Sequence, residues 1–152
     1  MPTKPALHID EVTPGTGTDY PPPHDGPCRQ RRRRRLSDVF GLDQFGVNLV
    51  ELAPGTWSSQ RHWHERQDEF VYVVEGEVSL VTDAGETLLR AGMFAGFRAG
   101  EPNGHHLVNR SQVAARVLEV GTRTAEETAH YSDIDMIYRE GSGYIARDGR
   151  PL

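Results

Sequence analysis

The sequence predicts an all-β fold, built as one barrel or sandwich of short strands. The chain has 152 residues, which is enough for one domain with a real core and too few for two independent domains. Its 16 glycines and 10 prolines indicate many turns, and closely spaced apolar segments of strand length lie between them. No internal repeat divides the chain, so we expect a single barrel.

The composition disfavours several classes of protein. No run of about 18 apolar residues is present, so we expect no membrane span. The N-terminal segment lacks the apolar core of a secretory signal, and the single cysteine, Cys28, has no intramolecular disulfide partner. Both features favour a cytoplasmic protein. The net charge of −5 argues against a general nucleic-acid binder, and Schiff-base chemistry is disfavoured because the only lysine, Lys4, lies in the tail.

The first 35 residues differ in composition from the rest of the chain. Residues 1–27 are rich in Pro, Gly and Thr and predict an extended arm, partly ordered at best. Residues 29–35 carry six arginines around Gln30, whereas acidic residues outnumber basic ones elsewhere. We expect these arginines to lie on the surface and pair with the acidic body, and a nucleic-acid contact is the less favoured alternative. The predicted organisation is an arm over residues 1–35 and one β-barrel domain over residues 36–152.

One helical turn and a series of strands follow the arm. Residues 36–42 fit the helical turn, and the Pro54-Gly55 pair ends the first strand after it. The expected strands cover residues 45–53, 69–75, 77–82, 86–89, 93–97, 105–109, 113–121 and 134–139.

The strand expected at residues 69–75 has the clearest pattern, and both of its faces are apolar. Its inward face carries Val71 and Val73, and its outer face is formed by Phe70, Tyr72 and Val74. An apolar outer face indicates that something covers it, either the arm or a second subunit. We therefore expect a homodimer.

Four of the seven histidines fall in the β-rich region, in two pairs. His62 and His64 flank Trp63, and residues two apart in a strand point to the same face, so both imidazoles can aim at one point. Glu69 begins the next strong strand and reaches the same point if residues 65–68 reverse the chain. Two imidazole nitrogens and one carboxylate oxygen suit Fe(II), Mn(II), Zn(II) or Ni(II).

A fourth ligand must come from a distant segment, and His105 and His106 are the candidates. Adjacent strand residues face opposite sides of a sheet, so only one of the two points inward. An inward His105 also turns Leu107 and Asn109 inward, whereas an inward His106 turns Val108 inward. The strand pattern by itself leaves this choice open.

Two motifs in this region resemble those of the cupins, a superfamily of β-barrel proteins. The first has the pattern G-x6-H-x-H-x4-E-x6-G, and the second has the pattern G-x5-P-x-G-H-x3-N. The residues of the first motif are Gly55, His62, His64, Glu69 and Gly76. Those of the second are Gly96, Pro102, Gly104, His105 and Asn109. The second motif is two residues shorter than the family pattern between its first glycine and its histidine. The resemblance covers residues 45–121, and the flanks are similar to those of small bacterial single-domain cupins.

This resemblance implies a cupin-type jelly-roll β-barrel that is open at one mouth, holds a metal inside and often forms dimers. The family's metal-binding histidine lies four residues before the asparagine, which selects His105. The expected metal ligands are therefore His62, His64, Glu69 and His105. Small cupins of this kind are often labelled as sugar-phosphate-isomerase-like or as transcriptional regulators.

Four protein ligands on a six-coordinate metal leave about two open positions at which a small molecule can bind. We therefore expect one divalent metal ion (Mn, Fe, Zn or Ni) and a metal-dependent enzyme that acts on a small polar substrate, sugar-like or carbonyl. Its reaction would be an isomerisation, an epimerisation or, with Fe(II), a dioxygenation, and a non-catalytic ligand-binding or sensing cupin is the alternative. A DNA-binding regulator is least favoured, because no helix-turn-helix precedes the barrel. Glu51, Gln60 and Asn48 are candidates for contacts around the ligands.

The expectation of a phosphorylated sugar meets a difficulty in the sequence. A phosphate group calls for a cluster of cations at the barrel mouth. The barrel segments offer only scattered arginines, namely Arg61, Arg66, Arg90, Arg98 and Arg110. The sequence thus predicts a metal site more firmly than it predicts a reaction.

Overall fold

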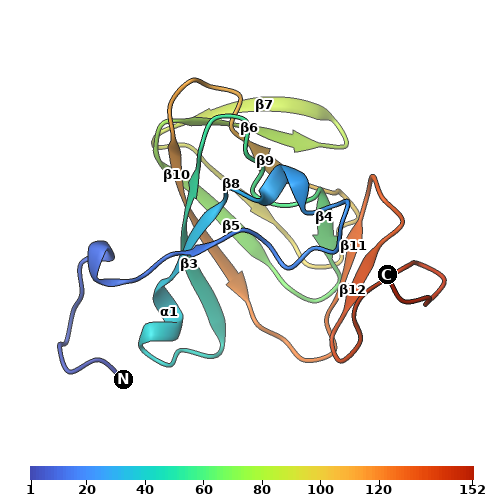
Figure 1. Ribbon diagram of the computed structural model, residues 1–152, viewed down its shortest axis with the longest axis horizontal. Coiled ribbons are helices and arrows are strands. Elements are labelled where there is room, and N and C mark those ends of the chain that lie inside the picture. Colours follow the sequence, from blue (N-terminus) through green and yellow to red (C-terminus); the bar gives the residue numbers. More distant parts are fainter.

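The computed structural model describes residues 1–152 and confirms the all-β fold, a jelly-roll barrel made of three antiparallel sheets (Figure 1). The largest sheet has the strand order β1-β2-β3-β10-β5-β8. Its strands are β1 (Gly15–Thr16), β2 (Arg32–Arg35), β3 (Phe45–Leu52), β10 (Ala115–Thr122), β5 (Glu69–Glu75) and β8 (Phe94–Phe97).

Two smaller sheets complete the barrel. One consists of β7 (Gly85–Arg90), β6 (Glu77–Thr82) and β9 (His106–Val108), in that order. The other consists of β13 (Gly143–Ile145), β12 (Ile137–Arg139), β11 (Thr128–Tyr131) and β4 (His62–His64). Helical structure is limited to two 3-10 turns and one α-helical turn, η1 (Ile9–Glu11), η2 (Gly26–Cys28) and α1 (Leu36–Val39). None of these has the length or the apolar content that crossing a membrane requires.

The longer strands match the segments expected from the sequence, and the differences fall on short elements. Strands β3, β5, β6, β7, β8, β9 and β10 each overlap an expected strand, and α1 lies within the expected helical turn. The sequence does not predict β11 and β13, which have only four and three residues and so show no clear alternation. The segment 134–139 is a strand only from Ile137 to Arg139.

The main core lies inside the barrel and is built from the inward faces of its strands. Val71 and Val73 of β5 belong to it, as their alternation with exposed neighbours predicts. The ten buried residues of this cluster are Val50, Leu52, Val71, Val73, Val78, Leu80, Leu89, Leu107, Ala115 and Val117.

The outer face of β5 is apolar and exposed. Phe70, Tyr72 and Val74 keep between 37% and 48% of their surface open to solvent. Phe94 on the neighbouring strand β8 is 65% exposed and extends this face. The N-terminal arm does not bury these side chains, so the expected homodimer, in which a second copy covers them, stays a prediction.

The N-terminal arm packs against the barrel along much of its length. In Figure 1 its blue segment crosses the molecule from the side of α1 toward β11. Tyr20 and Cys28 are buried in a second cluster with Ala129, Tyr131 and Met136. The chain then returns as β2, which pairs with β3 and so extends the largest sheet. Residues expected to form only an arm thus build part of the barrel wall.

Some side chains of the arginine run form ion pairs, and others are buried. Arg32 pairs with Glu51 at 3.2 Å and Arg33 with Glu119 at 3.4 Å, in line with the expected attraction to the acidic body. Arg31 and Arg34 are only 7% and 8% exposed, so the expectation that the whole run lies on the surface is wrong for them. Both are covered by other segments: Arg31, just before β2, donates to the carbonyls of Ser58 and Gly17, and Arg34 donates to the carbonyl of Val12 in the arm.

We predict that Asn109→Ala destabilises the barrel by about 1–3 kcal/mol, because it removes a buried, fully used hydrogen-bonding group. Asn109 is 0% exposed; its Nδ2 donates to the carbonyls of Leu52 and Val113, both at 2.8 Å, and its Oδ1 accepts from Ser111. Urea denaturation followed by circular dichroism measures the change. The exposed Gln112→Ala is the control, with an expected change within about 0.5 kcal/mol. Equal stability of the two variants would contradict this role.

Candidate metal centre

Strand β4 supplies two of the predicted ligands, His62 and His64. It pairs with β11, where His62 lies opposite Tyr131. Between them Trp63 stacks on His130, with ring centroids 4.3 Å apart, on the other face of the strand. His62 and His64 therefore share one face, as their spacing predicts, and both line the barrel cavity.

Glu69 is the first residue of β5 and follows the loop that reverses the chain after β4. The buried carboxylate of Glu127 fixes this loop. It accepts hydrogen bonds from the backbone N–H groups of Glu65 at 3.1 Å and Arg66 at 3.0 Å. The reversal brings Glu69 back to the two histidines of β4.

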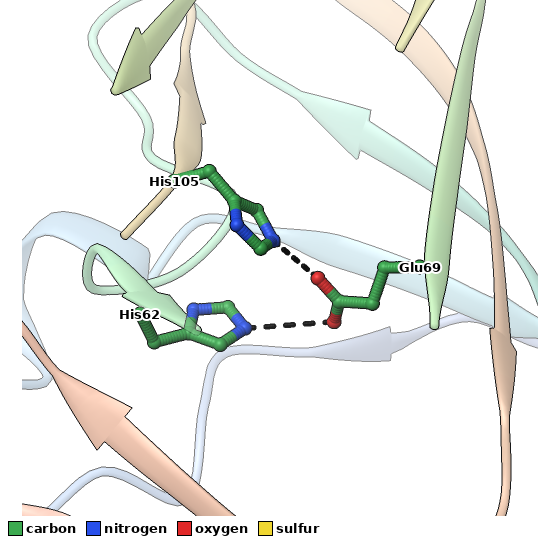
Figure 2. Close-up of side chains that lie close together, drawn as sticks. All are labelled: His62, Glu69 and His105. Atoms are coloured by element: carbon green, nitrogen blue, oxygen red, sulfur yellow. Dashed lines mark hydrogen bonds and ion pairs between the residues drawn. The ribbon is translucent and has the colours of Figure 1, made fainter. Parts of the chain in front are cut away.

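The carboxylate of Glu69 is the point at which the predicted ligands meet. Its Oε1 lies 2.7 Å from His64 Nε2 and 3.5 Å from His62 Nε2, and its Oε2 is in close contact with His105 Nε2. His62 and His105 approach this carboxylate from the side opposite its own strand (Figure 2). One ligand atom each from His62, Glu69 and His105 lie within 4.8 Å of one another, and His62 Nε2 is 3.1 Å from His64 Nε2.

The two adjacent histidines of the second motif take different directions. The ring of His105 stacks on Phe97, with centroids 3.6 Å apart and planes 3° from parallel. Phe97 lies opposite Glu69 in the β5–β8 pairing. The same sheet therefore positions both the Glu69 carboxylate and the Phe97 ring that supports the His105 imidazole. His106 instead places its Nδ1 2.8 Å from the carbonyl oxygen of Ser59. The structure thus brings His105, and not His106, to Glu69.

Gly104 precedes His105 at a point of close approach. A Cβ atom at this position would lie 1.9 Å from Ser132 Oγ, which is far inside van der Waals contact. This position of the second motif therefore requires a glycine for a steric reason: without a side chain, the backbone before His105 can pass next to Ser132.

Each of the three imidazoles is held through its Nδ1 atom. His62 Nδ1 lies 2.8 Å from the carbonyl oxygen of Gln60, and His105 Nδ1 lies 3.4 Å from that of Asn103. His64 Nδ1 lies 3.1 Å from the buried carboxylate of Glu127. Carbonyl and carboxylate oxygens accept hydrogen bonds, so these contacts favour neutral rings that carry their proton on Nδ1.

This arrangement directs electron pairs toward one place. A neutral imidazole with its proton on Nδ1 has a lone pair on Nε2, and three such lone pairs face the oxygens of Glu69. Lone pairs at these separations repel one another unless protons or a metal cation lie among them. The donor set, three imidazole nitrogens and a carboxylate, therefore fits a first-row divalent metal ion.

Burial and neighbouring charges act in opposite directions on these groups. Burial alone would raise the pKa of Glu69, but the surrounding histidines hold that pKa well below its usual range. Burial would lower the pKa of His64, yet the carboxylates of Glu69 and Glu127 leave it above its usual value. For His105 burial prevails, and its pKa is lowered. Glu69 is thus ionised, which adds to the attraction of the cluster for a cation.

A cavity of about 530 Å³ adjoins the cluster, a volume typical of small-molecule sites. His62, His64, Glu69 and His105 line one side of it, and residues 15–20 of the arm line another. The predicted ligands therefore face a space that a small molecule can enter, as the sequence analysis expects for an open metal site.

The residues around the ligands were only partly foreseeable. Among the three candidates, Gln60 contacts His62 through its carbonyl, Asn48 lines the cavity, and Glu51 pairs with Arg32 instead. Glu127 was missed, because it lies 63 residues from His64 and no local pattern marks it.

A crystal structure of a protein from Silicibacter pomeroyi, described as a sugar phosphate isomerase from a cupin superfamily, matches this fold with a TM-score of 0.93. The two sequences are 48% identical, and the match covers 97% of this chain and 96% of the other. This chain belongs to the cupin superfamily. The family described as Cupin domain also matches this cupin over residues 48–121, a range that holds all four predicted ligands.

More distant structures share the barrel. A presumptive sugar phosphate isomerase from Acidithiobacillus ferrooxidans is 25% identical to this cupin, with a TM-score of 0.69 and coverage of 72% of this chain and 70% of the other. The polyketide cyclase RemF from Streptomyces resistomycificus is 24% identical, with a TM-score of 0.65 and coverage of 79% and 80%, and it shows the fold alone. Among curated proteins no match to this cupin is found.

We predict that Glu127→Gln weakens metal binding by about 10- to 100-fold, the effect typical of losing a partner that orients a histidine ligand. Calorimetric titration of the metal-free protein with Zn²⁺ measures this affinity. Glu126→Gln is the matched control, because the neighbouring Glu126 side chain is 79% exposed and contacts Arg66 rather than a histidine. If both variants bind Zn²⁺ as tightly as the wild type, Glu127 does not orient His64.

Proposed function

We propose that this cupin binds one divalent metal ion through His62, His64, Glu69 and His105 and uses it to isomerise a small polar, sugar-like substrate. The observation that carries this proposal is the convergence of three imidazole nitrogens on the Glu69 carboxylate beside a cavity. A purely structural metal site is normally closed by protein ligands on all sides. An open site is instead typical of catalysis or of small-molecule binding.

A divalent metal at this site would act as a Lewis acid that polarises a carbonyl or hydroxyl oxygen. The protein's own contribution is to hold the ligands rigidly: β4 presents two imidazoles, Phe97 supports His105, and Glu127 orients His64. These supports mean that little reorganisation is needed when a substrate binds.

Isomerisation of a sugar also needs a group that moves a proton on carbon, and Glu119 is our candidate. It lines the same cavity but lies outside the metal cluster. On β10, Gly121 lies opposite Glu69, and Glu119 comes two residues before Gly121. The backbone of Glu119 is therefore about 7 Å along β10 from the position opposite Glu69, on the same inward face. A carboxylate at that distance can serve a substrate whose oxygens lie at the cluster.

The similarity to the Silicibacter pomeroyi protein favours isomerisation over the alternatives, since that protein carries the description of a sugar phosphate isomerase and matches nearly the whole chain. An Fe(II) dioxygenase and a non-catalytic sensor use the same kind of site, because one cupin barrel serves many chemistries. The identity of the metal and its response to oxygen separate these three functions.

Metal analysis of the purified protein tests the proposal. We expect about one divalent ion per chain, and His62→Ala and His105→Ala should each weaken its binding by at least about 100-fold, since a ligand contributes more than its supporting partner. His106→Ala is the control, because its ring contacts Ser59 and not Glu69. Circular dichroism confirms that the variants remain folded.

Mn or Zn together with aldose–ketose interconversion, and without oxygen uptake, supports the isomerase. Iron with oxygen uptake supports the dioxygenase, and a bound metal without any turnover of sugars supports the sensor. A wild-type protein that is folded but binds no divalent ion at saturating concentration contradicts all three.

A further inference from the structure

Three alternate arginines of the N-terminal run, Arg31, Arg33 and Arg35, line the same cavity as the metal centre. In the β2–β3 register Arg33 lies opposite Val50, and Arg35 lies opposite Asn48. Residues directly opposite one another in a sheet project from the same face, and Val50 belongs to the barrel core. Arg33 and Arg35 therefore project into the barrel.

These arginines have hydrogen-bonding capacity that the protein does not use. Arg31 is buried and donates to two backbone carbonyl oxygens at 2.6 and 2.9 Å, but no carboxylate pairs with it and its Nε has no partner. Arg33 reaches Glu119 at 3.4 Å with one terminal nitrogen, and its buried Nε is also without a partner. Arg35, exposed at the end of β2, makes no side-chain hydrogen bond or ion pair. Arg31 is thus a buried cation without a paired anion, which is costly, and Arg33 and Arg35 leave donors unused beside it. Together these groups favour an anionic partner in the cavity.

The floor of the cavity carries no side chain directly across from Glu69. Glu69 lies opposite Gly121 on β10, and Gly121 lies opposite Gly46 on β3. Neither glycine has a side chain, and a Cβ at Gly46 would meet the guanidinium of Arg123 at 3.3 Å. Strands β10 and β3 separate β5 from β2, a backbone distance of about 14 Å at the usual spacing of strands. A ligand that contacts both groups must therefore reach across these two strands.

The charge of the cavity also favours an anion. Four arginines line it, with Arg123 as the fourth, against the carboxylates of Asp19, Glu69 and Glu119. Glu69 is already engaged by three histidines, and a bound divalent ion would increase the positive excess. Asn48 adds a buried, unpartnered Oδ1 that can accept a hydrogen bond from a hydroxyl group.

Resting on the proposed metal centre, we infer that the substrate carries an anionic group, a phosphate or a carboxylate, which Arg33 and Arg35 bind while its other oxygens face the Glu69 cluster. Guanidinium groups bind both anions through paired, charge-assisted hydrogen bonds. The arm thereby supplies the cluster of cations that the scattered arginines of the barrel do not provide.

Calorimetric titration of the metal-free, full-length protein with inorganic phosphate and, separately, with acetate tests this inference. We expect Arg33→Gln and Arg35→Gln each to weaken binding of at least one of these anions by about tenfold or more, the loss expected for a charge-assisted hydrogen bond. Arg32→Gln is the matched control. It removes the same charge from the same strand, but Arg32 pairs with Glu51 and does not line the cavity.

A loss confined to phosphate identifies the anion as a phosphate, and a loss confined to acetate identifies it as a carboxylate. Equal affinities of the wild type, R33Q and R35Q for both anions overturn the inference, and R35Q keeps this test valid because the exposed Arg35 has no partner to lose. His62→Ala distinguishes the two proposals: we expect it to weaken metal binding by at least about 100-fold and to leave anion binding within about twofold of the wild type. The inference is also overturned if anions bind only to the metal-loaded protein and neither R33Q nor R35Q changes their affinity.

Discussion

The site depends on one electrostatic constraint: a single half-buried carboxylate, that of Glu69, faces the Nε2 atoms of three imidazoles. The constraint arises because each ring is anchored through its other nitrogen, by backbone carbonyls for His62 and His105 and by Glu127 for His64. Electron pairs held this close repel one another, and a shared metal cation removes that repulsion. The sheet pairings, the stacking of Phe97 and the reversal of the chain after β4 all serve to maintain this convergence.

The second constraint is the position of the N-terminal arm. Because β2 pairs with β3, alternate arginines of a run with high positive charge line the cavity of the barrel. The same sheet thus carries Glu69 of the proposed metal centre on β5 and the proposed anion site on β2, with β10 and β3 between them. A substrate that spans the two would be oriented at both ends, which is how positioning contributes to rate.

The sequence predicts best what depends on local spacing. The shared face of His62 and His64 follows from the period of a strand, and the choice of His105 as a ligand rests on the resemblance to cupins. Glu127 could not be found this way, since its contact with His64 spans 63 residues and exists only in the folded chain. The arginine run shows the opposite problem: five consecutive arginines have no alternation, so which of them point inward depends on the pairing of β2 with β3. Composition alone favoured a surface patch.

The most direct test of the account is the position of a bound metal in crystals of the full-length protein soaked with Mn²⁺ or Zn²⁺, determined by anomalous diffraction at the metal edge. The account predicts one strong peak at about 2.0–2.2 Å from the Glu69 carboxylate and from the imidazole nitrogens of His62, His64 and His105. A peak elsewhere in the barrel, or no peak at saturating metal, would contradict it.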